Sequence, residues 1–352
     1  MGAKAIVVSL GAIAVSAVAA SAVLLAMLIK ANKRADPSKR TTKKVVIAHR
    51  GASGYLPEHT QASKVLAIEM GADFIEQDLV VTKDDQLIVM HDVQLDTMTN
   101  VADKFPDRKR EDGRYYAVDF TLEEIRQLRA TERFKHDDGT AMFPLRFPLW
   151  KSYFQVNTLA DEVELIEGLS KSRNKPRVGI YPEMKEPAFH MKEGKDIARL
   201  LTTELKRLGY SSKDDKIFIQ CFDFDTLRRL KEELLPEFQV DYPLVYLTKN
   251  NEVFDETMGL GWKKIKSVAD GIGPRWTQVV DESDGSSTGI VDAARAHGLL
   301  VHPHTLQRDR LPKFARDFDD LQRAVFVDAD ADGAFTDFSD ETREFLLRQC
   351  QE

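Results

Sequence analysis

Short apolar runs alternate with helical patterns from residue 45 to the end of the chain. Eight of these runs have the length and the flanking turn residues of β-strands. The predicted strands cover 45–49, 73–79, 177–181, 216–221, 243–247, 268–272, 298–302 and 333–336. The clearest predicted helices cover 60–70, 159–170, 194–208, 224–234, 289–297 and 340–349. Strands that alternate with helices in this order favour a parallel α/β architecture.

Eight strands are the number required for a closed (β/α)8 TIM barrel, and about 300 residues suit one such barrel with an insertion. The alternative is an open, doubly wound sheet, which needs a glycine-rich dinucleotide turn after its first strand. Residues 49–54 lack that glycine spacing. The predicted fold class is therefore α/β, a TIM barrel over residues 45–348.

Residues 93–157 interrupt this regular alternation. They are rich in charged and aromatic side chains, as at 112–116 and 143–148. A structureless connection of this length is unusual inside a domain unless it has a function. We expect a small insertion subdomain above the carboxyl ends of the strands, where barrel active sites lie.

The N-terminal segment has a different composition. Ala5–Ile29 contains no charged residue, and as a helix it is roughly 37 Å long, enough for a bilayer core of ~30 Å. We therefore predict that the barrel is preceded by an N-terminal transmembrane helix, residues 5–29, within an anchor and basic linker at 1–44. The alternative is a cleaved signal peptide, since the alanine-rich stretch 16–22 resembles a cleavage site. Cleavage would give a periplasmic or secreted protein.

Charge is distributed unevenly along the chain. Seven basic residues and one acid lie between residues 30 and 44. Because positively charged flanks of a membrane span tend to stay in the cytoplasm, this stretch favours a barrel on the cytoplasmic side. The alternative interpretation is a solvated linker. The formal net charge of the whole chain is −7, so the acidic excess lies entirely after residue 44. This balance argues against nucleic acid as a partner. The two cysteines, Cys221 and Cys350, are too few for a disulfide framework and match no metal motif.

Candidate chemistry is concentrated where three apolar runs end. His49 closes the run at 45–48, His91 closes the run at 87–90, and Glu76 and Asp78 stand inside the run between them. Side chains two residues apart share one face of a strand. A buried pair of carboxylates is costly unless a cation or hydrogen-bond donors compensate it. Two histidines beside such a pair indicate acid–base catalysis next to a metal ion.

The strand predicted near residue 180 adds a third acid. Glu183 and Lys185 share a face by the same parity. Three oxygen donors suit a hard divalent cation, Ca²⁺ first and Mg²⁺ as the alternative. Arg50 is suited to bind a phosphate with two hydrogen bonds, and with Lys185 it indicates a phosphate ester as the substrate. The opposing interpretations are an edge strand with acids in solvent and histidines satisfied within the core.

These residues also resemble a known family. The segments His49–Thr60, Glu76–Asp78, His91–Asp92 and Pro182–Lys185 resemble the glycerophosphodiester phosphodiesterases. The similarity to the bacterial periplasmic branch is more extensive, covering nearly all of 45–348. Its further segments are Asp107–Leu122, Gln220–Asp223, Gly271–Pro274, Val301–Pro303 and Phe335–Asp337.

The resemblance implies a role for each candidate residue. It implies a TIM barrel with an insertion after the second strand region and a divalent metal, Ca²⁺ or Mg²⁺. The implied metal ligands are Glu76, Asp78 and Glu183. The implied acid–base pair is His49 and His91, and the implied phosphate contacts are Arg50 and Lys185. The chain departs from the family pattern at His59, His304 and Arg275-Trp276, and the last pair bears on the pocket for the alcohol.

The function implied is metal-dependent hydrolysis of a small-molecule glycerophosphodiester to sn-glycerol 3-phosphate and an alcohol. One alternative is a phospholipase D-like enzyme that acts on lysophospholipids or sphingolipids, since that group shares the two-histidine, acidic-metal arrangement. Another is a non-catalytic, membrane-tethered binding barrel. The presence of both histidines and all three acids favours an enzyme over this second alternative.

Overall fold

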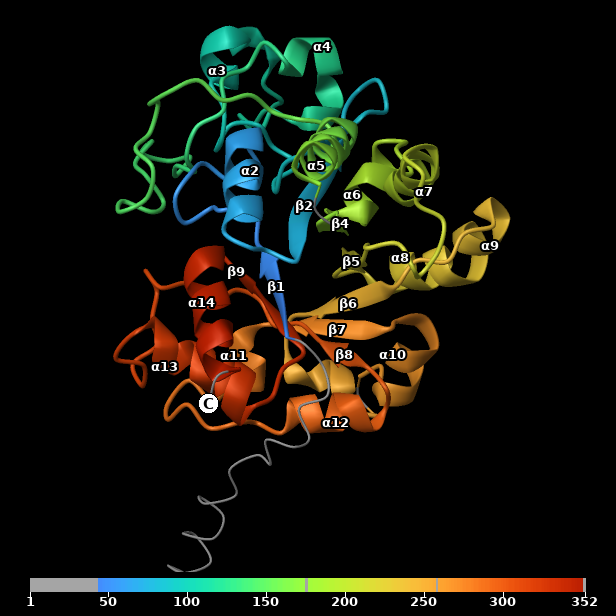
Figure 1. Ribbon diagram of the computed structural model, residues 1–352. Coiled ribbons are helices and arrows are strands. Elements are labelled where there is room, and N and C mark those ends of the chain that lie inside the picture. The colour runs from blue at the N-terminus through green and yellow to red at the C-terminus, as the bar shows by residue number, and fades with distance from the viewer. Residues whose placement is uncertain (1–43, 175–176, 258, 351–352) are drawn as a thin grey trace, which may run out of the picture. The chain divides into compact units, whose positions relative to one another are not determined.

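Eight parallel strands curve into a barrel in the computed structural model, which describes residues 44–174, 177–257 and 259–350 (Figure 1). The barrel strands are β1 (Val45–Ala48), β2 (Phe74–Val81), β4 (Gly179–Met184), β5 (Ile219–Cys221), β6 (Leu244–Thr248), β7 (Gly271–Pro274), β8 (Leu300–Val301) and β9 (Gly333–Thr336). Their hydrogen-bonded order is β8-β7-β6-β5-β4-β2-β1-β9. The predicted transmembrane residues, 5–29, lie outside the described part of the chain.

The two ends of this sheet meet through backbone hydrogen bonds between the segments around β8 and β9. The amide of Asp332 donates to the carbonyl of Val301 at 3.1 Å, and that of Phe335 donates to Pro303 at 2.9 Å. The sheet is therefore nearly closed, and the predicted TIM barrel is confirmed.

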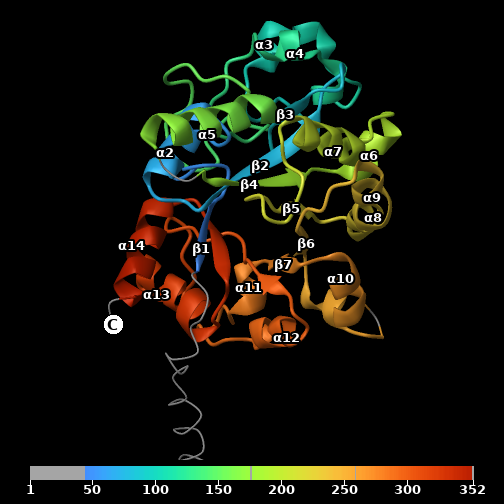
Figure 2. The same ribbon diagram turned by 45° about the vertical axis from the view of Figure 1, so that its right-hand side comes forward.

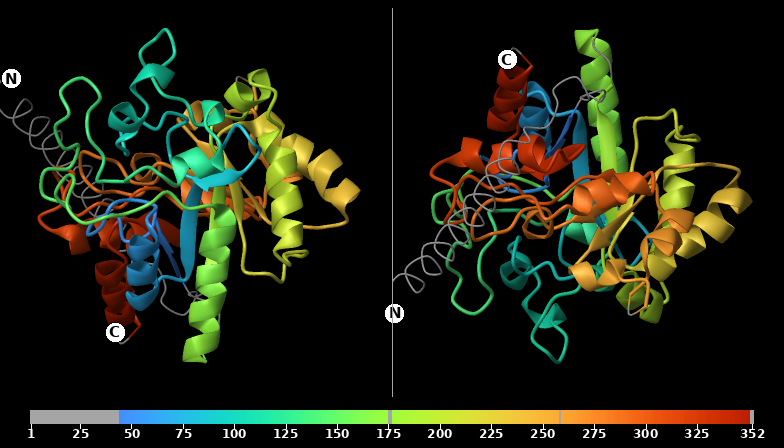
Figure 3. Two further views of the ribbon diagram at one scale, coloured as in Figure 1. Left: turned by 90° about the horizontal axis from the view of Figure 1, so that it is seen from above. Right: turned by 90° about the horizontal axis from the view of Figure 1, so that it is seen from below.

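Helices surround the strands on the outside (Figures 1 and 2), and the views from above and below show the same arrangement (Figure 3). The barrel helices are α2 (Gln61–Glu69), α5 (Leu159–Arg173), α6 (Pro187–Lys192), α7 (Ile197–Arg207), α8 (Phe224–Arg229), α9 (Leu235–Phe238), α10 (Trp262–Val268), α11 (Trp276–Val279), α12 (Ile290–Ala296), α13 (Phe318–Arg323) and α14 (Ser339–Gln349), while α3 (Val101–Lys104) and α4 (Leu122–Ile125) belong to residues 93–157. Side-chain caps fix several helix starts, because they satisfy amides that lack a partner within the helix. Thr60 caps α2 and Thr158 caps α5. Within the described ranges, no helix has both the length and the apolar character needed to cross a bilayer.

One further strand, β3 (Leu87–Val89), is not part of the barrel. It pairs antiparallel with the outer half of β2, where Leu79 faces Val89. This hairpin carries the chain away from the barrel into residues 93–157. His91 therefore follows the hairpin and does not lie on a barrel strand.

Residues 93–157 pack around an apolar cluster of their own, which includes Leu95, Val101, Phe120 and Leu128. They contain α3, α4 and two 3₁₀ turns, Pro106–Arg108 and Ala117–Asp119. These residues are coloured teal to green in Figure 1, where their helices α3 and α4 lie at the top of the molecule. Because the cluster also includes Ile88 of β3 and Val80 of β2, the hairpin joins the insertion core to the barrel.

The barrel interior is filled near its amino end by apolar and aromatic side chains. These are Ile47, Phe74, Tyr181, Val245 and Phe335. The polar residues follow directly along the same strands, since Asp78 of β2 stands in register with Glu183 of β4. The apolar side chains thus fill the amino end of the barrel, and the carboxylates lie toward its carboxyl end.

Candidate active site

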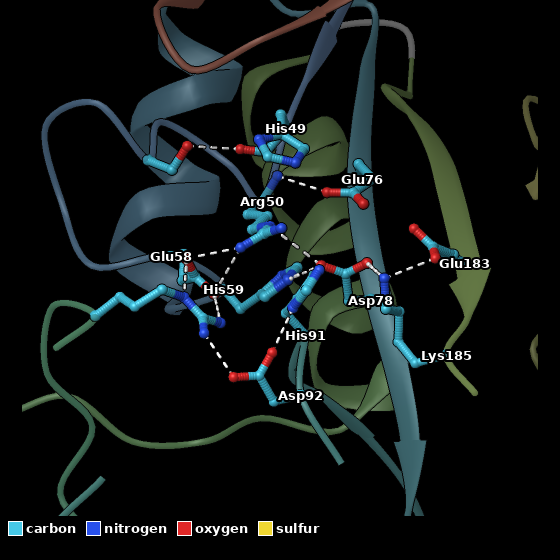
Figure 4. A network of polar contacts seen from close by, with 12 residues as sticks. His49, Arg50, Glu58, His59, Glu76, Asp78, His91, Asp92, Glu183 and Lys185 are labelled. Carbon is cyan, nitrogen blue, oxygen red and sulfur yellow. Dashed lines mark hydrogen bonds and ion pairs between the residues drawn. The ribbon is translucent and has the colours of Figure 1, made fainter. Parts of the chain in front are cut away.

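Three carboxylates meet at the carboxyl ends of β2 and β4. Glu76 and Asp78 lie on β2, Glu183 lies on β4, and all three are buried. Because β2 is hydrogen-bonded to β1 on one side and to β4 on the other, the interpretation of an edge strand with its acids in solvent is wrong. Figure 4 shows the three side chains pointing into one polar network.

Asp78 is at the centre of this network. Its Oδ2 contacts Nε2 of His59 at 2.8 Å and forms an ion pair with Nε of Arg50 at 3.2 Å. Its Oδ1 accepts no hydrogen bond, although Nζ of Lys185 lies 3.6 Å away. Burial by itself would raise the pKa of Asp78, but the charges of Lys185 and Arg50 hold the pKa well below its usual value.

Glu76 and Glu183 lie on either side of that charge. The backbone amide of Arg50 donates to Glu76 at 2.6 Å, and Nζ of Lys185 donates to Glu183 at 2.7 Å, as the shared strand face predicts. Burial, together with the charge of Asp78, raises the pKa of Glu76 and raises that of Glu183 to about 7. Burial beside the charge of Asp78 therefore disfavours the ionised forms of Glu76 and Glu183.

Each of the two histidines is held by a carboxylate behind its ring. Nδ1 of His49 lies 2.6 Å from Oδ1 of Asp337, and Nδ1 of His91 lies 2.5 Å from Oδ1 of Asp92. A carboxylate at Nδ1 fixes the tautomer with hydrogen on that atom, so Nε2 is free to exchange a proton. The side chains of His49 and His91 are 17% and 32% exposed.

Arg50 is engaged more fully than the sequence suggests. Its Nη1 donates to both carboxylate oxygens of Glu58, at 3.0 and 2.9 Å, while its Nε faces Asp78. The expectation of a free guanidinium that binds phosphate through two hydrogen bonds therefore needs correction. Most of this group is occupied by carboxylates, and Glu58 and Asp78 fix its position.

A cavity of about 670 Å³ opens over these groups. Six of the seven predicted site residues line it, namely His49, Arg50, Glu76, His91, Glu183 and Lys185. The seventh, Asp78, lies behind them and is fully buried. The structure thus brings the predicted site residues together around one cavity.

Residues 49–341 match the Glycerophosphoryl diester phosphodiesterase family. The chain belongs to this family. A glycerophosphodiester phosphodiesterase of Haemophilus influenzae is 44% identical over 86% of this chain and 90% of its own length. One of Treponema pallidum is 40% identical over 87% of this chain and 92% of its own length.

Solved structures of low sequence identity share the fold. A phosphodiesterase of Oleispira antarctica, determined in complex with the product sn-glycerol 3-phosphate, is 19% identical and aligns with a TM-score of 0.60 over 87% of this chain and 97% of its own. A glycerophosphodiester phosphodiesterase of Agrobacterium tumefaciens is 21% identical, with a TM-score of 0.55 over 86% and 100%. The family resemblance, its bacterial branch and the prediction of an enzyme are confirmed by these comparisons together.

The resemblance to glycerophosphodiester phosphodiesterases implies a divalent metal, and the donor set of this chain fits one. Glu76, Asp78 and Glu183 supply oxygen ligands of the kind that Ca²⁺ and Mg²⁺ prefer. Oδ1 of Asp78 is a buried acceptor without a donor, which is costly unless a cation compensates it. The donor set therefore agrees with the predicted carboxylates, and it does not distinguish Ca²⁺ from Mg²⁺.

His59 also lies close enough to Glu76 and Asp78 to be considered as a metal ligand. Its Nδ1, however, is 3.2 Å from Nζ of Lys64, and an ammonium group only donates hydrogen bonds. Nδ1 therefore accepts, and Nε2 carries the hydrogen that it donates to Asp78. Burial and the charge of Lys64 lower the pKa of His59 to about 3, so the ring is neutral. We interpret His59 as a support for Asp78.

Several residues of the site were not singled out by the sequence patterns. They are Glu58, His59, Lys64, Asp92, Asp337 and Gln220. Most of them occur inside the family motifs, which was the one available signal. Their partners were not predictable, because contacts between distant segments leave no local periodicity.

Proposed function

We propose that this protein hydrolyses glycerophosphodiesters to sn-glycerol 3-phosphate and an alcohol, with a divalent cation and the pair His49 and His91. One observation carries this proposal. Two histidines, each with a carboxylate at Nδ1, line the same cavity as two buried acidic side chains, Glu76 and Glu183. The Oleispira antarctica phosphodiesterase, which has the same fold, was determined with sn-glycerol 3-phosphate.

The cation is proposed to bind Glu76, Asp78 and Glu183, with Ca²⁺ as the first choice and Mg²⁺ as the alternative. When bound, it stabilises the negative charge that develops on the phosphoryl oxygens. Lys185 donates to Glu183 and lines the cavity, which supports the proposal that its ammonium group contacts the phosphate. Arg50 also lines the cavity, and we propose that its Nη2 contacts the phosphate.

The proton transfers are assigned to the two histidines. Nε2 of one ring accepts a proton from the attacking oxygen, which belongs to water or to the glycerol hydroxyl of the substrate. Nε2 of the other ring, in its protonated form, donates to the oxygen of the leaving alcohol. Attack by the glycerol hydroxyl would pass through a cyclic phosphate, and product analysis in ¹⁸O-labelled water with rapid quenching separates the two routes.

The metal assignment is tested by Glu76→Gln, Asp78→Asn and Glu183→Gln. Each variant should bind Ca²⁺ more weakly and lose roughly a hundredfold or more in activity, because the cation supplies several kcal/mol of the barrier reduction. Glu186→Gln is the matched control, since Glu186 is an exposed acid on the same cavity. Full activity of all three variants in excess chelator would show that the assignment is wrong.

The acid–base assignment is tested by His49→Ala and His91→Ala, with the exposed His136 replaced by alanine as a control. Each active-site variant should retain less than about a tenth of the wild-type rate, since general acid–base catalysis contributes ~10²–10⁴-fold. Glycerophosphocholine and lysophosphatidylcholine are the two substrates to compare. Preference for the second would favour the phospholipase D-like alternative, and turnover of neither would favour a binding barrel.

We further propose that residues 5–29 anchor the protein to a membrane, on the length and the uncharged character of that segment alone. Carbonate extraction of the full chain should leave it in the membrane fraction. N-terminal sequencing of a soluble form that begins near Ala22 would instead establish a cleaved signal peptide, and export to the periplasm or the medium. Protease protection in sealed vesicles decides on which side the barrel lies.

A further inference from the structure

Two buried arginines extend from residues 93–157 toward the active site. The side chain of Arg133 is 12% exposed and that of Arg146 is 5% exposed. Both stand in segments without helix or strand, so no repeating pattern marks them. The guanidinium group of each arginine donates to a carboxylate, and that carboxylate contacts a histidine of the proposed acid–base pair.

Arg133 connects to His91 and to Arg50. Its Nη1 donates to Oδ2 of Asp92 at 2.5 Å, and the other oxygen of Asp92 lies on Nδ1 of His91. Its Nη2 donates to Glu58 at 2.7 Å, and Glu58 in turn binds Arg50. Figure 4 shows these two carboxylates apart, with Glu58 at the left and Asp92 at the bottom of the network. One guanidinium therefore fixes the groups behind two cavity side chains.

Arg146 makes the equivalent connection to His49. Its Nη2 donates to Oδ2 of Asp337 at 2.7 Å, and the other oxygen of Asp337 lies on Nδ1 of His49 at 2.6 Å. The remainder of the guanidinium is held by Asp309, through Nε at 2.8 Å, and its central carbon lies 3.8 Å from the centre of the Phe143 ring. This arginine thus has a fixed position before it reaches Asp337.

A carboxylate orients an imidazole only when it is ionised and immobile. A planar guanidinium provides both conditions, because it is always charged and donates in fixed directions. We propose that Arg133 and Arg146 are positioning residues through which the insertion holds both histidines in their reactive orientation. The barrel supplies His49 and the β2–β3 hairpin supplies His91, while the insertion supplies the two cations. This inference rests on the proposed function.

Kinetics of Arg133→Gln and Arg146→Gln with glycerophosphocholine and saturating Ca²⁺ test the proposal. Because groups that orient a reactive ligand typically change activity 10–100-fold, kcat should fall by about that factor while KM changes by less than about threefold. Arg133→Lys and Arg146→Lys should recover part of kcat, since the charge remains. Arg114→Gln is the matched control, because Arg114 makes a bidentate pair with Asp96 inside the insertion and touches neither histidine.

A second measurement does not depend on activity. Protons shared between Nδ1 and a carboxylate at these short distances should resonate far downfield in the ¹H NMR spectrum of ¹⁵N-histidine-labelled protein. The His91 signal should shift or broaden in Arg133→Gln alone, and the His49 signal in Arg146→Gln alone. In Arg114→Gln both signals should remain as in the wild type.

The proposal is overturned if both glutamine variants keep kcat within about threefold of wild type, or if both histidine signals are unchanged. It is also overturned if Arg114→Gln loses as much activity as they do, because the loss would then follow general destabilisation of the insertion. Failure of the proposed function looks different: the wild-type protein itself would release no glycerol 3-phosphate, while the NMR signals would still respond to the substitutions.

The rim of the cavity carries an independent feature, a pair of basic side chains on neighbouring strands. Lys249 follows β6 and Arg275 follows β7, directly after the register pair Thr248 and Pro274. Both line the cavity and both are exposed. Within residues 44–174, 177–257 and 259–350, neither forms an ion pair with an acid, so their charge is available to a ligand.

The ring of Phe222, which lines the same cavity, is already close to two cations. Nζ of Lys249 lies 5.7 Å and Nζ of Lys185 lies 5.9 Å from the centre of the Phe222 ring. A quaternary ammonium, which normally binds an aromatic face, would meet like charge there. We propose that Lys249 and Arg275 form a subsite for a leaving alcohol that carries a second, anionic phosphodiester. This inference also rests on the proposed function.

Two substrates that differ only in that group test this subsite. Bis(glycerophospho)glycerol and glycerophosphoglycerol both lose a glycerol alcohol from phosphorus, and only the first has a further phosphodiester on it. Wild-type kcat/KM should be about tenfold higher for the first, and the ratio of the two kcat/KM values should fall to about one in Lys249→Gln/Arg275→Gln. A preference that is absent in the wild type, or unchanged in the double variant, overturns the subsite, whereas cleavage of neither substrate overturns the proposed function.

Discussion

The replacement of Asp337 by asparagine tests the active-site geometry most directly, since the side chain keeps its size and loses only its charge. The Asp337 side chain is 1% exposed and uses both oxygens. Oδ1 accepts from His49 and from the Ser53 hydroxyl, while Oδ2 accepts from Arg146 at 2.7 Å and from Gln307 at 2.6 Å. Burial opposes ionisation of Asp337, but His49 and Arg146 hold its pKa below the usual value.

An asparagine side chain has one oxygen and one amide group, so it can accept hydrogen bonds from the donors on only one of these two sides. Its oxygen must face Arg146, because a guanidinium only donates hydrogen bonds, so its amide group turns toward Nδ1 of His49. The imidazole then accepts at Nδ1 and carries its hydrogen on Nε2, which is the wrong tautomer for accepting a proton. Loss of a general acid–base group costs ~10²–10⁴ in rate, and each tenfold corresponds to about 1.4 kcal/mol. We therefore expect kcat to fall by ~10²–10⁴, with KM changed by less than about threefold.

The assay measures release of glycerol 3-phosphate from glycerophosphocholine with a coupled dehydrogenase, at saturating Ca²⁺. Asp309→Asn is the control, because Asp309 binds the same arginine at 2.8 Å and does not touch His49. Both variants should lose a similar ~1–3 kcal/mol in free energy of unfolding, measured by urea denaturation. The geometry is refuted if Asp337→Asn keeps more than about a tenth of wild-type kcat, or if Asp309→Asn loses as much as Asp337→Asn.

Three further predictions concern stability. Burial and the nearby Glu58 raise the pKa of Glu132 to about 8 from 4.5. The folded state therefore holds a proton that the unfolded state lacks between these pH values, and the free energy of unfolding should fall as pH rises through that window. Glu132→Gln should lack this slope and exceed the wild type in stability at pH 9; parallel denaturation curves for both proteins from pH 4 to 9 would contradict this. Phe120→Ala should cost ~3–5 kcal/mol in urea denaturation, since Phe120 is fully buried in the insertion core, and a loss under about 1 kcal/mol would mean that this core contributes little. Lys64→Met should cost ~3–5 kcal/mol because it leaves Glu162, 3.3 Å from Nζ, buried without a cation; Lys64→Met/Glu162→Gln should recover part of this, and no recovery would contradict the explanation.

Local periodicity explains what the sequence predicts well. The alternation of eight apolar runs with helices indicates the barrel, because a buried parallel strand and an amphipathic helix each have a characteristic period. The same period of two places Glu76 and Asp78 on one face, and Glu183 and Lys185 on another strand's face, where the structure shows them in contact. Boundaries are less well predicted: the run at 268–272 becomes β7 at Gly271–Pro274. The short helices α10 and α13 were not among the clearest predicted helices, since one or two turns show little periodicity.

The sequence by itself therefore determined the barrel, the family and six of the residues that line the cavity. Only the tertiary structure decided how these residues are held. Asp337 reaches His49 across 288 positions of the chain, and Arg146 reaches Asp337 across 191. His59, inside a motif, supports Asp78 only because the ammonium group of Lys64 fixes its tautomer. The physical reason is that a repeating pattern specifies which face of a strand or helix is buried, whereas the partner of a buried charge depends on packing between segments that share no period.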